Sequence, residues 1–263
     1  MSTRFHKGAF TGINLARAMS EPAYAIYDGD NFVTLPHTFG NIIGGYDSTG
    51  SDATSGTAIL VSEIPGVALE LTTDDDTNDG IYISRQTGAT DNMIGPFDIT
   101  LNSGRVLAFE SKFKVVQGTD VAIACGLGEY GNSDQDTLVD TTGALINEDF
   151  IGFHCAAHTT DVDIDGVYRI SGGDMVVGGD TMTEDEDDKF HVYGFRFDGG
   201  TTVDWFLDNR HFDSSTLTAA TFPTGQALNV FFGAKTIEAV EKELVIKYWQ
   251  CVELLLSEDQ LAD

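Results

Sequence analysis

The chain has 263 residues, 41% of them hydrophobic, and its 42 acidic against 14 basic side chains give a formal net charge of −28. Nucleic acids and anionic membranes bind basic surfaces, so this charge argues against both as partners. No apolar run approaches the roughly 18 residues that a membrane span requires, and the first 20 residues lack the apolar stretch of a signal peptide. We expect a hydrated acidic surface whose self-repulsion is screened by salt, or one that partly binds divalent cations.

Glycine is abundant and proline is rare, with 29 and 5 residues respectively. That balance is typical of a chain with many hairpin turns, and the length fits one large β domain. The three cysteines, Cys125, Cys155 and Cys251, lie inside apolar strand patterns without any CxxC spacing. We therefore predict buried free thiols that pack as small hydrophobic side chains.

The N-terminal segment differs from the rest, since no acid precedes Glu21. Its basic residues and two of its aromatic residues are Arg4, Phe5, Lys7, Phe10 and Arg17. The chain then becomes rich in Gly, Ser, Thr and Asp, so we predict an extended arm and linker over residues 1–56. Two interpretations stay open. The segment is either an untethered terminus or a cationic, partly apolar arm that docks on a neighbouring acidic subunit.

Short strand patterns follow one another from Thr57 onward, and turn signals separate nearly every pair. In chain order they cover residues 57–63, 67–72, 80–85, 97–101, 105–116, 121–128, 150–158, 161–170, 190–212, 227–233 and 243–255. Many short strands without helical periodicity predict an antiparallel sandwich over residues 57–256. Ser257 and Gln260 have the spacing of a capping box, which predicts a short helical tail over 257–263.

Alternation with a period of two predicts which side chains face the core. Val203, Trp205 and Leu207 alternate with polar or exposed positions, so we expect them to point inward. In the last strand the same rule predicts one buried face, formed by Leu244, Ile246, Tyr248, Val252 and Leu254.

Several of these strands resemble a known family. The stretches that carry the likeness are FESKFK (109–114), FHVYGFRFD (190–198), TTVDWFLDNRHF (201–212) and LVIKYWQCVEL (244–254). Together they resemble the concanavalin A-like jelly roll of legume lectins, laminin G-like modules and many bacteriophage virion proteins. The second of the paired strands ends in Asp208-Asn209 where the family commonly has Asp-Gly, and Asn also tolerates a left-handed turn. The resemblance implies an all-β, antiparallel β-sandwich.

Catalytic constellations are not apparent in the sequence. Glycosidases with this fold place paired carboxylates on one strand, about 5 Å apart. The nearest candidate here is Glu110, but Lys112 and Lys114 occupy the alternating positions where further carboxylates would be needed. We find no Ser-His-Asp order, phosphate-binding loop or dinucleotide fingerprint. We therefore expect a protein that is not an enzyme and that requires no cofactor.

Calcium is the metal that the acidic side chains would suit best. Asp161, Asp163 and Asp165 begin as an EF-hand loop does, but position twelve is Gly172 instead of glutamate. Strand alternation predicts that all three carboxylates share one exposed face, where a calcium ion would relieve their repulsion. The alternative is a solvated acidic loop. We interpret His154 and His158, roughly 13 Å apart along a strand, as ordinary strand histidines.

Two functions fit this sequence. The first is a structural protein of a tailed-phage particle, made in the host cytoplasm and located in the virion as a capsid decoration or cement protein. It would form homo-oligomers or contact other virion proteins through Arg4, Phe5, Lys7, Phe10 and Arg17, and lattice repetition would strengthen weak contacts. The second is a lectin-like module of a tail fibre or spike that binds surface glycans. Tyr46 and Tyr130 would then stack on sugar rings.

Overall fold

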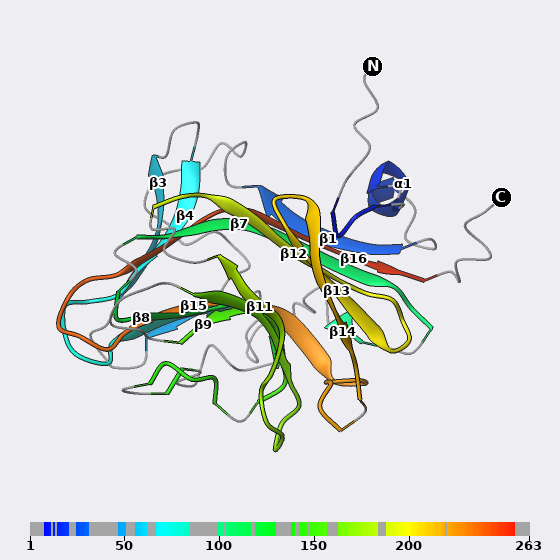
Figure 1. The fold of residues 1–263 in the computed structure, drawn as a ribbon. Helices are drawn as coiled ribbons and strands as arrows, with labels where there is room; N and C mark the ends of the chain where they lie inside the picture. The colour runs from blue at the N-terminus through cyan, green and yellow to red at the C-terminus, as the bar shows by residue number, and fades with distance from the viewer. Residues whose placement is uncertain are drawn as a thin grey trace.

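Two antiparallel β-sheets stacked face to face form the fold, as the sequence predicted (Figure 1). The computed structural model describes residues 8–11, 13, 15–20, 25–31, 47–50, 56–62, 67–84, 99–101, 104–116, 119–129, 138–139, 142–146, 148–156, 163–183, 188–218 and 220–255. The helical tail predicted for residues 257–263 lies outside these ranges.

The first sheet, sheet A, brings the two ends of the described chain together. In spatial order it contains β14 (Arg210–Thr216), β13 (Thr202–Leu207), β12 (His191–Phe197), β7 (Leu107–Val116), β16 (Glu243–Leu254), β4 (Val67–Thr72) and β3 (Thr57–Ser62). One edge of β16 pairs with two strands, since β4 covers its residues 243–246 and β1 (Ala25–Asn31) covers residues 248–254.

The second sheet, sheet B, packs against sheet A. Its spatial order is β11 (Val176–Thr183), β10 (Ile164–Arg169), β9 (Phe150–Cys155), β8 (Val121–Glu129), β15 (Ala227–Thr236), β5 (Gly80–Ser84) and β2 (Asp47–Gly50). The short β6 (Ile99–Thr100) pairs with β15. Both β1 and β2 fall within residues 1–56, the predicted arm and linker, so part of that segment belongs to the sandwich.

The core lies between the sheets and is rich in aromatic side chains. Phe109 stacks on Phe195 with ring centroids 5.4 Å apart, and Phe153 meets Trp205 edge-on at 5.9 Å. Val203 and Trp205 are fully buried there and Leu207 packs against the cluster, which confirms the predicted inward face of β13. The three cysteines are free and buried, as predicted.

A register shift in β16 corrects the predicted face of the last strand. Ile246 pairs with Phe113 and Tyr248 pairs with Lys112, so one extra residue bulges between them. A bulge reverses the side-chain alternation beyond it. The core therefore receives Leu244, Ile246, Trp249 and Cys251. Tyr248, Val252 and Leu254 face the other side, contrary to the prediction.

The Trp205 side chain fills the space between the two sheets near β11 and β14. Its indole packs on three glycines of sheet B, Gly166, Gly178 and Gly179. An added Cβ at Gly178 would lie 2.7 Å from the indole nitrogen, and one at Gly166 would overlap the ring. Only glycine lets the backbone of β10 and β11 approach this closely.

A satellite apolar cluster covers the outer face of sheet A. Ala9, Phe10 and Ile13 pack there against side chains of β16 and of the segment entering β7. Phe10 is only 1% exposed. The Phe10 ring, predicted to contact a partner, is thus buried against its own domain in this structure, and its contact with a partner stays a prediction.

A further apolar cluster lies on the outer face of sheet B. Tyr82 stacks on Phe231 at 6.0 Å, and the bridge between Leu138 and Leu145 brings two leucines over this face. The six-residue α1 (Leu15–Ser20) contacts β1 beside sheet A (Figure 1). No helix in the described ranges is long and apolar enough to cross a membrane.

Candidate functional site

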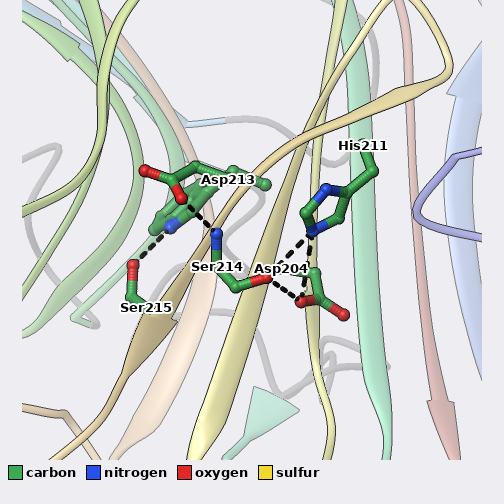
Figure 2. A network of polar contacts seen from close by, with 6 residues as sticks. Asp204, His211, Asp213, Ser214 and Ser215 are labelled. Atoms are coloured by element: carbon green, nitrogen blue, oxygen red, sulfur yellow. Dashed lines mark hydrogen bonds and ion pairs between the residues drawn. The ribbon is translucent and has the colours of Figure 1, made fainter.

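A network of polar side chains lies on the outer side of the β13–β14 hairpin (Figure 2). The Ser214 hydroxyl donates to Asp204 Oδ1 at 2.7 Å. His211 Nε2 lies 2.9 Å from Ser214 Oγ and 3.5 Å from Asp204 Oδ1. Side-chain exposure is 54% for His211 and 35% for Asp204, so the network is open to solvent. It therefore offers a carboxylate, a hydroxyl and an imidazole at one accessible place.

The hairpin itself positions these groups. Asp208 and Asn209 have positive φ angles of 49° and 62°, the turn geometry that suits the twist of a two-residue hairpin. A register shift between Trp205 and Phe206 then sets Asp204 opposite Ser214 and Phe206 opposite His211. The Phe206 and His211 rings meet edge-on, with centroids 5.7 Å apart. An aromatic ring therefore borders the polar network.

The other face of the hairpin holds it in place. Trp205 Nε1 donates to Ser215 Oγ at 2.8 Å, and the Asp213 carboxylate accepts the backbone N–H of Ser214 at 2.8 Å (Figure 2). Because Trp205 is fully buried in the core, this bond anchors the edge strand β14 to the sandwich. The exposed network thus rests on a rigid support, as a binding site requires.

The Asp, His and Ser side chains do not form a nucleophilic triad. In a triad the serine and the carboxylate bind opposite nitrogens of the imidazole, so that the histidine can take the serine proton. Here both Ser214 and Asp204 face the same nitrogen, Nε2, and the serine proton points to the carboxylate. This geometry presents hydrogen-bonding groups without activating the hydroxyl for attack.

Sequence reasoning missed this network. The alternation of β13 placed Asp204 and Phe206 on the face opposite the core, which was a usable signal. No signal showed that His211 and Ser214 of the next strand would meet them, because the register shift decides which residues lie opposite.

The predicted sugar-stacking residues Tyr46 and Tyr130 lie outside the described residues, as do Asp161, His158, Arg4, Phe5 and Lys7. Arg17 is described and lies half-buried in α1. His154 Nε2 lies 2.8 Å from the Gly143 carbonyl oxygen, which confirms the interpretation of this residue as an ordinary strand histidine.

The predicted calcium ligands are only partly described. Asp165 Oδ1 accepts the backbone N–H of Thr181 at 2.7 Å, and Asp163 Oδ1 is buried with no hydrogen-bond partner among the described atoms. Both side chains are half-buried, whereas alternation predicted an exposed face. Within the described ranges, no three His, Cys, Asp or Glu side chains come together to hold a metal. Calcium binding stays a prediction.

Glu110, the nearest candidate for a catalytic carboxylate, is buried on the outer side of β7. Its Oε1 accepts the Tyr248 hydroxyl at 2.8 Å and the Gln250 side-chain amide at 3.2 Å. Burial, together with the charge of Glu110, raises the pKa of Tyr248 well above its usual value. The tyrosine therefore keeps its proton and serves Glu110 as a hydrogen-bond donor.

A second acidic cluster joins the ends of β8 and β9. Burial and the nearby carboxylates of Glu129 and Asp149 raise the pKa of Glu148 from 4.5 to about 7. Glu148 Oε2 is buried and has no hydrogen-bond partner among the described atoms. The ionised form of Glu148 is therefore disfavoured, both by burial and by repulsion from these two carboxylates.

We expect the variant Glu148→Gln to be more stable than the wild-type protein at about pH 8 and equally stable at about pH 4. The folded state binds the Glu148 proton more tightly than the unfolded state does. The free energy of unfolding therefore falls as pH rises from 4.5 to about 7. Glutamine keeps the neutral form at every pH. Because the side chain is only half-buried, solvent screening limits the gain to about 1 kcal/mol.

Urea unfolding of both proteins over this pH range measures the difference. The exposed Glu241→Gln variant is the control for the change in net charge. Equal stability of wild type and Glu148→Gln at pH 8 would contradict the expectation.

Comparisons with known proteins concern the fold. No protein-family model and no curated protein matches this sequence. The globular domain of T. cruzi calreticulin superposes with a TM-score of 0.55 and 11% identity, covering 89% of this chain and 90% of that one. The carbohydrate recognition domain of Emp47p gives 0.53 and 12%, covering 87% and 94%. A protein of unknown function from Shewanella oneidensis MR-1 gives 0.50 and 11%, covering 88% and 87%. At this level of identity the similarity shows the fold alone, an antiparallel lectin-like jelly roll.

Proposed function

We propose that this chain is a carbohydrate-binding module that uses the outer side of the β13–β14 hairpin. The proposal rests on one observation: the side chains of Asp204, His211 and Ser214 contact one another at a solvent-exposed place beside the Phe206 ring. A similar fold in the Emp47p carbohydrate recognition domain supports it as an analogy of fold only.

The chemistry of a sugar matches this arrangement. Neighbouring hydroxyls of a pyranose each donate and accept a hydrogen bond, and the C–H groups of the ring form an apolar face. Asp204 can accept from one hydroxyl, while His211 and Ser214 can exchange hydrogen bonds with the next. Few convergent polar groups beside an aromatic surface are the usual composition of a small-ligand site. Because the network is open to solvent and partly satisfied by its own hydrogen bonds, we expect modest affinity.

A glycan array followed by calorimetry on the best ligand tests the proposal. We expect Asp204→Asn and His211→Ala each to weaken binding by about tenfold or more, since each removes a charge-assisted or directional hydrogen bond. The matched control is Asp213→Asn. Asp213 lies on β14 with His211, and its carboxylate accepts the Ser214 N–H instead of joining the network. We expect this control to bind as the wild type does.

The array is repeated with a calcium chelator, which separates a direct site from one that depends on calcium. Recovery of the glycan unchanged after incubation is expected of a binding module, and a cleaved product would contradict it. The proposal would be contradicted if no glycan bound in either condition, or if the three variants bound the ligand with equal affinity.

A structural role in a tailed-phage particle is a separate proposal. Three sequence features support it: a jelly-roll pattern without a catalytic set, a basic segment before an acidic domain, and strand patterns that resemble phage virion proteins. Arg4, Phe5 and Lys7 of the basic segment lie outside the described residues. The copy number of this chain in purified particles tests it, because a decoration protein is present in many copies and a tail-fibre module in few.

A further inference from the structure

Residues 8–11 and 13, here called the knob, dock in an apolar socket on the outer face of sheet A. Ala9, Phe10 and Ile13 of the knob are 0%, 1% and 6% exposed. The socket consists of Ala25, Val106, Ala108, Gly194, Val252 and Leu254. The knob therefore buries its apolar side chains against a defined surface without being a strand of either sheet.

The knob keeps its shape through local hydrogen bonds. The Thr11 N–H donates to the Gly8 carbonyl at 3.0 Å, and the Ile13 N–H donates to the Phe10 carbonyl at 3.0 Å. The Gly8 N–H in turn donates to Thr11 Oγ1 at 3.0 Å. Arg196 of β12 adds a bond from the sheet, from Nη1 to the Thr11 carbonyl at 2.8 Å. A knob folded this way can dock without ladder pairing to its own chain.

The socket is shaped for this knob. An added Cβ at Gly194 would lie 3.1 Å from Ala9 Cβ, and one at Gly8 would lie 3.1 Å from Asn209 Cα. Two glycines thus permit the close approach. The knob–socket cluster is also separate from the main core between the sheets. Loss of the knob would expose the socket while leaving the main core intact.

Charge complementarity to the basic N-terminal segment is available on another copy as well as on the chain's own domain. The first 20 residues carry three basic side chains and no acid, whereas the whole chain has a net charge of −28. The remaining residues therefore sum to −31, and each copy presents an acidic surface to the basic segment of its neighbour. Such complementarity steers association and selects partners.

We propose that the socket also accepts the knob of a second copy, so that neighbouring copies exchange their N-terminal segments. Exchange of an identical element is a low-cost route to association, because every contact already exists within the monomer. Residues 14–24 join the knob to β1, and eleven extended residues reach about 36 Å, roughly the diameter of a small domain. The six-residue α1 within this link is too short to be stable alone, so it can open.

Concentration decides which knob fills the socket. A tethered knob has an effective concentration in the millimolar range, so each chain fills its own socket in dilute solution. Exchange needs copies held at comparable concentration, as on a repetitive surface. The inference does not rest on glycan binding, although Phe206, which borders the β13–β14 network, also packs against the knob–socket cluster.

Cysteine cross-linking between two full-length variants tests the exchange. One variant carries Ala9→Cys in the knob and the other carries Gly194→Cys in the socket. Their Cβ atoms would lie 3.1 Å apart, so a shift of a few tenths of an ångström reaches the distance of about 3.5–4.5 Å that a disulfide has. The three native cysteines are buried. After mixing at about 1 mM in about 0.15 M salt, where screening limits repulsion between copies, we expect a disulfide-linked heterodimer under mild oxidation.

Two controls separate docking from random collision. Gly200→Cys places an exposed cysteine away from the socket, and we expect at least tenfold less cross-linking of Ala9→Cys to it. Adding Phe10→Ala to the Ala9→Cys chain should lower cross-linking similarly, because the buried anchor is lost. Cross-linking to Gly194→Cys no faster than to Gly200→Cys would overturn the inference.

A second measurement is needed in case the Gly194→Cys substitution prevents the socket from forming. The double variant on one chain should cross-link within that chain if the socket still forms. If it does not, light scattering at about 1 mM compares wild type with Phe10→Ala. A dimer for wild type and a monomer for the variant are expected, and equal masses would overturn the inference.

Discussion

Replacing Gly166 with alanine is expected to lower the free energy of unfolding by about 3 kcal/mol. The new Cβ would overlap the indole of Trp205, which is fully buried at the seam between the sheets. The ring cannot easily move away, because Phe153 and Phe195 pack on it and its nitrogen donates to Ser215. Overpacking of a rigid aromatic side chain must therefore be relieved by moving backbone.

Urea unfolding followed by tryptophan fluorescence measures this loss. Gly200→Ala is the matched control, since Gly200 lies in an exposed turn and its nearest neighbour would be 3.4 Å from an added Cβ. We expect the control to change stability by less than about 0.5 kcal/mol. If overlap with the ring is the cause, Trp205→Phe combined with Gly166→Ala should cost less than the sum of the two single variants. Equal costs for Gly166→Ala and the control would contradict the explanation.

Replacing Arg169 with methionine is expected to cost about 2–3 kcal/mol and to loosen the segment that covers sheet B. The guanidinium donates from Nη1 to the carbonyls of Leu145 and Ile146, at 2.6 and 3.0 Å, and from Nε to the carbonyl of Gly173 at 2.8 Å. Methionine preserves much of the apolar stem but leaves these three acceptors without their donor. Because Leu145 packs over the outer face of sheet B, its backbone should then open more often.

Hydrogen exchange at residues 142–146, together with urea unfolding, measures both effects. Arg210→Met on the exposed β14 is the control for the loss of one positive charge. We expect Arg169→Lys to recover little stability, because an ammonium cannot reproduce the planar set of donors. Unchanged protection in Arg169→Met would show that the segment is held by its leucines alone.

Much of the fold could be predicted from the alternation of apolar residues. Val203 and Trp205 face the core as expected, since a strand with one buried face has a period of two. β1 and β2 were not predicted, because their sequences are rich in Gly, Asp and Ser and carry little apolar periodicity. Pairing with β16 and β5 makes them strands, and a partner strand is not visible in local sequence.

The candidate site could be predicted only in part. Asp204 and Phe206 had to face away from the core once Trp205 faced it. Their meeting with His211 and Ser214 depends on a shift of one residue between two strands, and such a shift leaves no mark in composition or charge. The residues predicted for sugar stacking lie outside the described ranges, so that prediction stays open.

The sequence by itself determined the all-β class, the acidic surface, the buried cysteines and most strand positions, because these depend on residue type and short-range alternation. Only the tertiary structure decided register and docking. One bulged residue in β16 turns Tyr248, Val252 and Leu254 to the outer face, and Phe10 then finds a socket beside two of them. Both outcomes depend on contacts between segments far apart in the chain, where a single-residue shift exchanges inside for outside.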